Sequence, residues 1–272
     1  MLTLNNLCTG YGRKIIGRGL CARLERGTLT AMLGDNGAGK STLLRTLAGF
    51  IPPIKQNGAS EPAVRWNGRD ISAFAPAELA RTLSVVLTYR PEADALTARE
   101  VVETGRIPYR SAFGVYLLRG EAAREDARMV SRAMELTRIT RFAHRPISTL
   151  SDGERQRVFI AKALAQSTPA ILLDEPTAFL DFPSKVELLR LLRHLAHSEG
   201  KTILLSTHNV ETALHFADNL WLLRPDGITT GTPAELAEKG EINAFFAPHG
   251  IRFDAAAGRM VYDAAAPYAS TH

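Results

Sequence analysis

The sequence predicts an α/β fold with a parallel core sheet that helices cover on both sides. Short apolar runs, such as 170–173 and 202–205, alternate along the chain with longer stretches of helical character. These runs lack the in-and-out alternation of a half-exposed strand, which is typical of strands buried on both faces. Buried strands separated by crossover helices favour a parallel sheet.

The same reading places each element in order. Strands are predicted over 2–7, 27–34, 63–68, 83–88, 170–174 and 202–207. Helices are predicted to begin near Lys40, to run from Asp152 to about Gln166, and to run from about Pro183 to His197. Residues 97–145 are predicted to be mainly helical, with an irregular stretch over 105–114. Residues 220–229 predict a hairpin with Asp226-Gly227 at its turn, and the last ten residues predict a frayed tail.

Composition narrows the class of protein. The chain has 272 residues, of which 45% are hydrophobic and 22% charged, which is ordinary for a soluble globular protein. No apolar run approaches the roughly 18 residues of a membrane span, and the first residues lack a secretory pattern. Cys8 and Cys21 have no paired spacing, so we expect neither a disulfide framework nor a zinc site, and we expect both thiols to be reduced and cytosolic.

The net charge of +5 is unevenly distributed, because residues 99–145 hold ten arginines against six acids. Arg124, Arg128 and Arg132 fall four apart, on one face of a predicted helix. This spacing favours a solvated helix face. A nucleic-acid surface is disfavoured because no aromatic residues are interleaved, whereas an anionic membrane surface nearby would also fit.

The first chemical motif is GDNGAGKS, residues 34–41, which we call the phosphate loop. It matches G-x-x-x-x-G-K-[ST] between a predicted strand and a predicted helix. Gly34, Gly37 and Gly39 allow backbone amides to converge on phosphate oxygens at a helix amino end. Lys40 supplies charge for the β- and γ-phosphates, and we expect it to face solvent when the site is empty. The Ser41 hydroxyl suits Mg²⁺.

Two further strand ends carry polar groups. Asp174 and Glu175 follow the apolar run 170–173, at the end of a strand where open α/β sheets bind ligands. Asp174 is placed to hold Mg²⁺ through water, and Glu175 could orient or deprotonate an attacking water. Acids after a strand are also common helix caps, but beside a complete phosphate loop the catalytic interpretation is favoured. His208 follows the run 202–207, where a lone histidine is usually structural or solvated.

A second helix start could close this site. Ser151 and Glu154 have the spacing of a capping box, in which each side chain satisfies an orphan amide of the helix start. Most such strings do no more than this. Here Ser151 and the backbone amide of Gly153 could also close over the γ-phosphate, since a helix amino terminus attracts anions.

The order of these motifs resembles the ATP-binding cassette (ABC) family of transport ATPases. The family's signature, usually L-S-G-G-Q, stands here as LSDGE at residues 150–154, and the similarity runs from about Leu2 to about Gly231. The resemblance implies a P-loop NTPase fold of the ABC type, with a parallel core sheet, an antiparallel β subdomain and a helical subdomain at about 89–150. It implies an ATPase domain over 1–240, with a C-terminal extension over 241–272.

By this resemblance, two subunits pack head to tail and the signature of one completes the ATP site of the other. Tyr11 matches the aromatic residue that stacks on adenine, and Asp181 matches the acid of the D-loop, residues 178–181. His208 matches the switch histidine that contacts the γ-phosphate, and Glu175 and His208 are the expected catalytic pair. Mg²⁺ is expected at Ser41 and Asp174. The expected ATP-binding residues are Tyr11, Gly34, Asp35, Asn36, Gly37, Ala38, Gly39, Lys40, Ser41, Thr42, Ser151, Gly153, Glu154 and Asp181.

The chain departs from the family pattern at two positions. Asp152 replaces a glycine of the signature, and we expect its side chain to point outward, where it complements the helix dipole. Thr88 stands where the family carries a glutamine, counted back from Thr97. Thr88 either ligates the metal, through a water or a loop shift, or only links the catalytic core to the helical segment. We favour the second interpretation.

The segment 96–114 is similar to the corresponding part of ATPases that serve ferric-siderophore, haem and cobalamin importers. We therefore expect an ATP-hydrolysing subunit that powers uptake of an iron-siderophore complex. The alternatives are a haem or cobalamin importer, or a soluble ABC ATPase acting on nucleic acid or the ribosome. The expected partners are a second ATPase subunit, integral membrane permease subunits and, indirectly, a periplasmic or surface substrate-binding protein, with no nucleic acid. We expect the subunit at the cytoplasmic face of the inner (plasma) membrane.

Overall fold

The computed structural model describes residues 1–54, 63–88, 95–110, 120–254 and 259–262. Its main sheet has six strands in the order β10-β9-β3-β8-β7-β6. These are β3 (Leu29–Leu33), β6 (Leu83–Val86), β7 (Ala170–Asp174), β8 (Thr202–Ser206), β9 (Asn219–Arg224) and β10 (Gly227–Gly231). Five strands are parallel and β10 pairs antiparallel with β9. The predicted parallel core is confirmed, and every residue of β3, β7 and β8 is buried.

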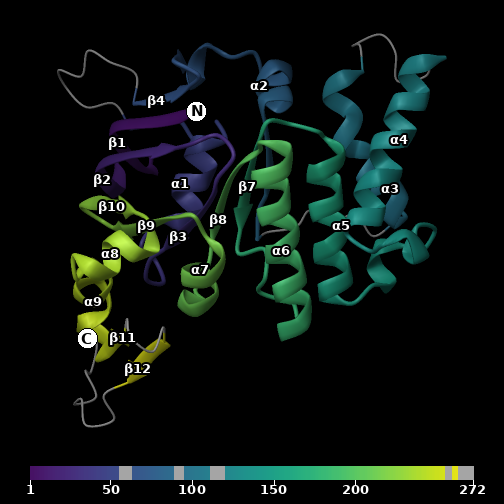
Figure 1. The fold of residues 1–272 in the computed structure, drawn as a ribbon. Helices are drawn as coiled ribbons and strands as arrows, with labels where there is room; N and C mark the ends of the chain where they lie inside the picture. Colours follow the sequence, from purple (N-terminus) through teal and green to yellow (C-terminus); the bar gives the residue numbers. More distant parts are fainter. Residues whose placement is uncertain (55–62, 89–94, 111–119, 255–258, 263–272) are drawn as a thin grey trace.

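A second, antiparallel sheet has the order β2-β1-β4-β5 and covers the left side of the molecule in Figure 1. Its strands are β1 (Leu2–Tyr11), β2 (Lys14–Leu24), β4 (Val64–Trp66) and β5 (Arg69–Asp70). Helix α1 (Lys40–Leu47) shares one hydrophobic cluster with both sheets, to which Leu44, Leu4 and Leu172 belong. The phosphate loop is therefore held between two sheets.

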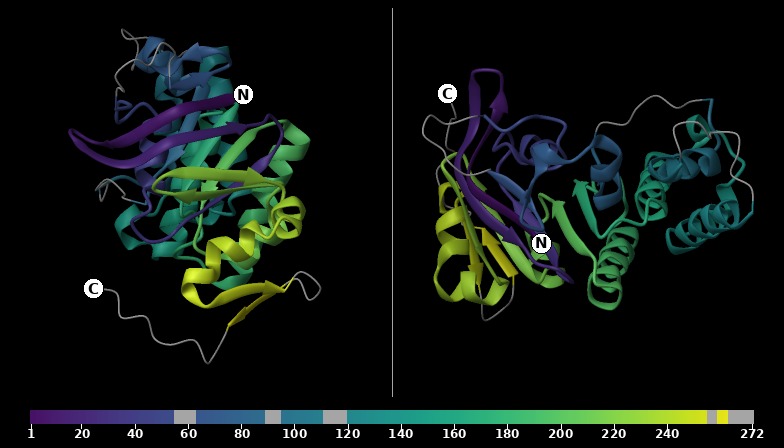
Figure 2. Two further views of the ribbon diagram at one scale, coloured as in Figure 1. Left: turned by 90° about the vertical axis from the view of Figure 1, so that its left-hand side faces the viewer. Right: turned by 90° about the horizontal axis from the view of Figure 1, so that it is seen from above.

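The helical part of the chain stands beside the sheet. It contains α3 (Ala98–Glu103), the short 3₁₀ helix η2 (Thr104–Tyr109), α4 (Glu121–Leu136), η3 (Thr140–Phe142) and η4 (Ile147–Thr149). Helix α2 (Pro76–Thr82) leads into β6, and α5 (Asp152–Ala165), α6 (Phe182–Glu199) and α7 (Val210–Phe216) pack beside the main sheet. Both figures place α3 and α4 at the opposite end of the molecule from the C-terminal elements (Figures 1 and 2).

The predicted helices are confirmed within a few residues, with two corrections. The irregular stretch predicted over 105–114 is a 3₁₀ helix as far as Tyr109, and 111–114 lie outside the described residues. The predicted turn at Asp226-Gly227 is wrong by one residue. Gly227 pairs with Arg224 in the hairpin, so Pro225 and Asp226 form the turn. No helix in the described ranges is long and apolar enough to cross a membrane.

The basic face of α4 is exposed, as a solvated helix face requires. Arg128 pairs with Glu125 on the same helix, and Arg132 pairs with Glu199 at 2.6 Å. Both arginines thus pair with acidic residues of the same chain at its surface. The arginine spacing on α4 is therefore explained without a nucleic-acid partner.

A buried ion pair holds the helical part against α5. Arg106 is 5% exposed; its Nε lies 2.7 Å from Asp126 Oδ1, and its Nη1 donates to the carbonyl oxygen of Ala165 at 2.8 Å. Gly105 packs so closely that a Cβ there would lie 2.4 Å from the Lys162 carbonyl oxygen. The last turn of α5 is thereby fixed to η2 and α4.

Removing the charge of Arg106 is expected to destabilise the fold. Arg106→Met leaves Asp126 with only the more distant Arg110, whose Nε lies 3.6 Å from Asp126 Oδ2, and breaking a buried pair in this way costs up to about 3–5 kcal/mol of unfolding free energy. Urea denaturation followed by circular dichroism measures this loss. Arg128→Met, which breaks an exposed pair on the same helix, is the control and should leave the midpoint unchanged. An equal effect of both variants would contradict a special role for the buried pair.

The C-terminal elements pack against the main sheet. They are α8 (Pro233–Glu238), α9 (Glu241–Phe246), η5 (Ala247–His249), β11 (Ile251–Asp254) and β12 (Arg259–Tyr262). Ile242, Phe246 and Met260 belong to the same hydrophobic cluster as β7 and β8. The predicted frayed tail, 263–272, lies outside the described residues.

Candidate active site

The phosphate loop connects β3 to α1, and its glycines shape an open cradle. Gly37 and Gly39 adopt φ angles of +82° and +95°, in the region that only glycine enters at no steric cost. A Cβ at Gly37 would meet nothing within 4 Å, whereas one at Gly39 would lie 2.6 Å from Ile16 Cγ2 of β2. The loop is open on one side and backed by β2 on the other. Its backbone is therefore free to approach a phosphate group.

Lys40 is folded into the loop. The side chain was predicted to face solvent in an empty site, and this prediction is wrong, since the residue is only 6% exposed. Its Nζ donates to the carbonyl oxygens of Gly34 at 2.7 Å and Asp35 at 3.0 Å. Burial lowers the pKa of Lys40, and the negative charges of Glu175 and Asp174 partly oppose that shift. The loop's own carbonyls thus hold the ammonium in place before any ligand arrives.

The two acids lie at the end of β7, next to the end of β8. Asp174 is 2% exposed, and its Oδ1 accepts a hydrogen bond from Ser206 Oγ at 2.7 Å. Ser206 Oγ in turn accepts from the backbone amide of Glu175 at 2.9 Å. Glu175 has a φ of +49°, which is uncommon for a residue with a side chain. One buried hydroxyl therefore holds both the carboxylate of Asp174 and the backbone of Glu175.

His208 follows β8 and reaches Glu175. Its Nε2 is in contact with Glu175 Oε1, although 33 positions of sequence separate the two residues. The His208 side chain is 45% exposed and that of Glu175 is 23% exposed. The strand-end histidine is thus neither a core residue nor simply solvated, because it forms one unit with the acid.

Thr88 lies beside the acids as well. Its Oγ1 donates to the backbone carbonyl oxygen of Asp174 at 3.3 Å. The hydroxyl proton therefore tethers the residue after β6 to the end of β7, within the core sheet, and the role of Thr88 in linking the core to the helical segment stays a prediction.

The predicted capping box at the start of α5 is confirmed. Glu154 N donates to Ser151 Oγ at 3.3 Å, and Ser151 N donates to Glu154 Oε2 at 3.0 Å. A Cβ at Gly153 would lie 3.1 Å from the Phe179 carbonyl oxygen, so the signature rests directly on the D-loop. The side chain of Asp152 is 64% exposed and lies 3.9 Å from Arg155. The Asp152 side chain therefore points outward, beside a residue of its own helix, as expected.

Asp181 and Tyr11 have local partners too. Asp181 Oδ1 accepts from Ser184 N at 3.1 Å and caps α6, and the hydrogen bonds from Ser184 lower the pKa of the Asp181 carboxyl. Tyr11 is 45% exposed at the end of β1, and its hydroxyl accepts from Arg45 Nη1 at 3.2 Å.

The predicted residues form two groups in a single chain. Lys40, Asp174, Glu175 and His208 gather where β3, β7 and β8 end. The phosphate loop and His208 also line a cavity of about 450 Å³, which we call the phosphate-side hollow. The signature and the D-loop line a different cavity of about 690 Å³, the signature-side hollow, which includes none of the phosphate-loop residues. The sequence reading missed Ser206, although a serine at the end of a buried apolar strand was a usable signal.

Comparisons with known proteins agree with this geometry. The family model described as "ABC transporter" matches residues 18–178, and a model for an AAA domain, described as a putative AbiEii toxin of a type IV TA system, matches 143–214. The iron(3+)-hydroxamate import ATP-binding protein of Bacillus subtilis is 38% identical over 86% of this chain and 83% of that protein. The achromobactin transport ATP-binding protein of Dickeya dadantii is 35% identical over 90% and 87%. The cobalamin import ATP-binding protein of Halobacterium salinarum is 36% identical over 83% and 53%.

Solved structures give the same result. The ATP-binding subunit of an ABC transporter superposes with a TM-score of 0.76 at 24% identity, over 91% of this chain and 98% of that one. A dimeric ATP-binding cassette in a post-hydrolysis state, with ADP and Pi bound, superposes with a TM-score of 0.71 at 27% identity, over 86% and 99%. This chain belongs to the ABC transporter family. It is an ATP-binding subunit of the kind that hydrolyses ATP, with the P-loop NTPase fold of that family.

Proposed function

We propose that this subunit hydrolyses ATP to drive uptake of an iron-siderophore complex through separate membrane permease subunits. The observation that carries the proposal is the convergence of a phosphate loop, Lys40, Asp174 and the Glu175–His208 unit where β3, β7 and β8 end. Relatives with siderophore import names at 35–38% identity support the class of cargo.

The roles of the site residues follow from their placement. The open backbone at Gly37 would receive the phosphates, and Lys40 would exchange its two carbonyl partners for phosphate oxygens. Tyr11 is exposed, so its ring is free to stack on the adenine. Glu175 would take a proton from the attacking water or orient that water. His208, which already contacts Glu175, would hold that carboxylate and the γ-phosphate in register.

The oxygens near the phosphate loop fit Mg²⁺. A serine hydroxyl at Ser41 and the carboxylate of Asp174 are hard oxygen donors, and Mg²⁺ usually takes one or two protein oxygens and completes its shell with water and phosphate. Asp174 Oδ1 already accepts from Ser206, so Oδ2 is the oxygen that remains for the metal or its water. When bound, Mg²⁺ would neutralise charge on the phosphates.

Substitution of Thr88 tests its part in this metal site. Thr88→Ala is expected to leave the ATPase rate within a few-fold, because the hydroxyl proton bonds a backbone carbonyl and the loss is one hydrogen bond, about 0.5–1.5 kcal/mol. Thr88→Gln restores the family's amide oxygen and is expected to raise Mg²⁺ affinity. The measurement is the ATPase rate against Mg²⁺ concentration for both variants and the parent. A large increase in the Mg²⁺ requirement of Thr88→Ala would assign the hydroxyl to the metal.

A second copy of the chain would complete the ATP site. The signature and the phosphate loop line different hollows within one chain, so Ser151 and Gly153 would close over a nucleotide held by the partner. The dimeric cassette with ADP and Pi bound, 27% identical, supports such an assembly. We propose the head-to-tail homodimer on this basis, with residues 1–240 as the ATPase domain, 89–150 as its helical subdomain and 241–272 as the extension.

The permease would dock on an apolar groove of about 520 Å³, which we call the permease groove. It lies at the opposite end of α5 from the signature. This groove lies between the carboxyl end of α1, the carboxyl end of α5 and helix α2. Phe50, at its edge, is 62% exposed, and such exposed apolar surface marks interaction sites. Docking there would place the subunit at the cytoplasmic face of the membrane, as a peripheral protein.

Two experiments test the proposal. Deletion of the gene followed by growth on defined iron sources identifies the cargo, and we expect loss of growth on one ferric siderophore. Growth that fails only on cobalamin or haem would move the cargo to one of those ligands, a choice that the cobalamin relative keeps open.

Pull-down of the tagged subunit from solubilised membranes should recover a multi-span membrane protein. Recovery of ribosomes or nucleic acid instead would favour a soluble ABC ATPase.

A further inference from the structure

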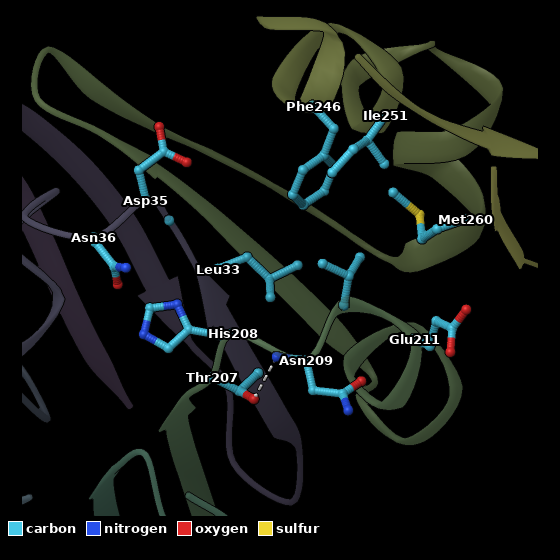
Figure 3. A pocket seen from close by; sticks show the side chains of 12 residues that line it. Leu33, Asp35, Asn36, Thr207, His208, Asn209, Glu211, Phe246, Ile251 and Met260 are labelled. Carbon is cyan, nitrogen blue, oxygen red and sulfur yellow. Dashed lines mark hydrogen bonds between the residues drawn. The ribbon is translucent and has the colours of Figure 1, made fainter. Parts of the chain in front are cut away.

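The phosphate-side hollow has two unlike halves, which Figure 3 shows from close by. Asp35, Asn36 and His208 form a polar half next to the phosphate loop. Phe246, Ile251 and Met260, from the C-terminal elements α9, β11 and β12, form an apolar half. In the proposed function, the polar half borders the ATP site. The apolar half has no part in it, although it opens into the same cavity.

The C-terminal wall of this hollow is fixed within the chain. Asn243 of α9 accepts a hydrogen bond from Phe253 N at 2.6 Å and donates to Phe253 O at 3.4 Å, which ties β11 to the helix. Phe246 and Met260 are 8% and 7% exposed and join the main hydrophobic cluster. The wall is therefore a pre-formed surface.

A matching apolar group lies beside the signature. Phe182, the first residue of α6, is 68% exposed, the largest exposed fraction among the exposed large hydrophobic residues of the described chain, and Phe179 of the D-loop is 47% exposed. Phe179 also borders the signature-side hollow, where its carbonyl oxygen meets Gly153. Two exposed phenylalanine rings this close in sequence would gain free energy if a partner covered them, because burial removes their apolar surface from water.

We propose that Phe182, with Phe179 beside it, packs into the apolar half of the phosphate-side hollow of a second copy of this chain. The inference rests on the proposed head-to-tail dimer, in which the signature edge of one copy faces the phosphate-loop edge of the other. The two phenylalanine rings adjoin the signature edge, and the apolar half of the hollow adjoins the phosphate-loop edge. The packing of the rings into the hollow would therefore extend the proposed dimer interface. Because each copy carries one such ring pair and one hollow, a twofold axis makes the contact twice.

In this arrangement the C-terminal elements act as a dimerisation wall. Closure of the two copies on ATP would bury both phenylalanine rings at once. Elements α9, β11 and β12 would then stabilise the ATP-bound dimer without touching the nucleotide.

Phe182→Ala tests the contact in a chain that also carries Glu175→Gln, so that hydrolysis does not dissolve the dimer. We expect the dissociation constant of the ATP-bound dimer to rise about 100-fold, about tenfold for each of two buried rings. Light scattering over a concentration series measures it. Phe50→Ala, which removes an equally exposed ring at the permease groove, is the matched control and should leave the constant unchanged.

A cross-link locates the contact. Phe182→Cys combined with Ile251→Cys, in a chain whose exposed Cys21 is changed to serine, should give a covalent dimer under copper phenanthroline. We expect it with ATP in the Glu175→Gln chain and not without nucleotide, on a non-reducing gel. Each single-cysteine chain is the control and should stay monomeric on that gel.

The outcomes separate this inference from the proposed function. If the Glu175→Gln chain stays monomeric with ATP, the proposed dimer is wrong and the inference falls with it. If that chain dimerises equally tightly after Phe182→Ala and the cysteine pair gives no cross-link, the dimer stands and the inference alone is overturned.

Discussion

Glu175→Gln is expected to keep ATP binding but to stall hydrolysis, so that an ATP-bound dimer accumulates. Loss of a general base or water-orienting group lowers the rate by about 10²–10⁴-fold. The neutral amide also removes a negative charge that would oppose the γ-phosphate, while its size preserves the contact with His208. Phosphate release gives the rate, and light scattering with Mg-ATP gives the mass.

The control for this variant is Glu125→Gln. Glu125 pairs with Arg128 on the exposed face of α4 and lines neither the phosphate-side hollow nor the signature-side hollow. We expect its rate and its mass distribution to match those of the parent chain. A Glu175→Gln chain that stays monomeric and turns over ATP normally would remove Glu175 from the catalytic role.

Lys40→Ala is expected to abolish measurable nucleotide binding. The ammonium is the positive charge closest to the cradle, and phosphate oxygens gain charge-assisted hydrogen bonds from it that alanine cannot supply. The folded-back position of Lys40 predicts a second effect. The carbonyl oxygens of Gly34 and Asp35 lose their partner, and this should lower the thermal midpoint slightly in the absence of ligand.

Calorimetric titration with ATP measures the binding, and Lys201→Ala is the matched control. Lys201 is half-buried, burial lowers its pKa as it does that of Lys40, and its Nζ donates to the carbonyl oxygen of Thr168 at 2.8 Å. It lies away from the phosphate loop, so we expect full ATP affinity after its removal. Unchanged ATP affinity in Lys40→Ala itself would rule out this loop as the phosphate site.

The features that sequence predicts well here are those with local causes. The phosphate loop needs φ angles above zero at Gly37 and Gly39, and the glycine spacing reports that need directly. The capping box is likewise predictable, because both of its hydrogen bonds join Ser151 and Glu154, within four consecutive residues. Strands β7 and β8 are recognisable because every residue in them is buried and all but Asp174 are apolar or small.

The features that were missed depend on distant parts of the chain. Strand β2 was not predicted, because its glycine-interrupted sequence gains its regularity only by pairing with β1. The inward position of Lys40 is a local exception, because the carbonyl oxygens of Gly34 and Asp35 that hold its ammonium lie only six and five residues away. The Glu175–His208 contact and the Ser206 bridge join residues from neighbouring strands. Family resemblance pointed to the residues, but not to their mutual contacts.

The permease groove has a further consequence, which arises from the direction of two helices. Helix α1 begins at the phosphate loop and α5 begins at the signature, and the far ends of both border this one groove. In the proposed head-to-tail dimer, α1 would serve its own subunit's ATP and α5 would serve the ATP held by the other. A membrane protein docked in one such groove would then act on both nucleotides. The two hydrolysis events should then be cooperative even when only one subunit is engaged.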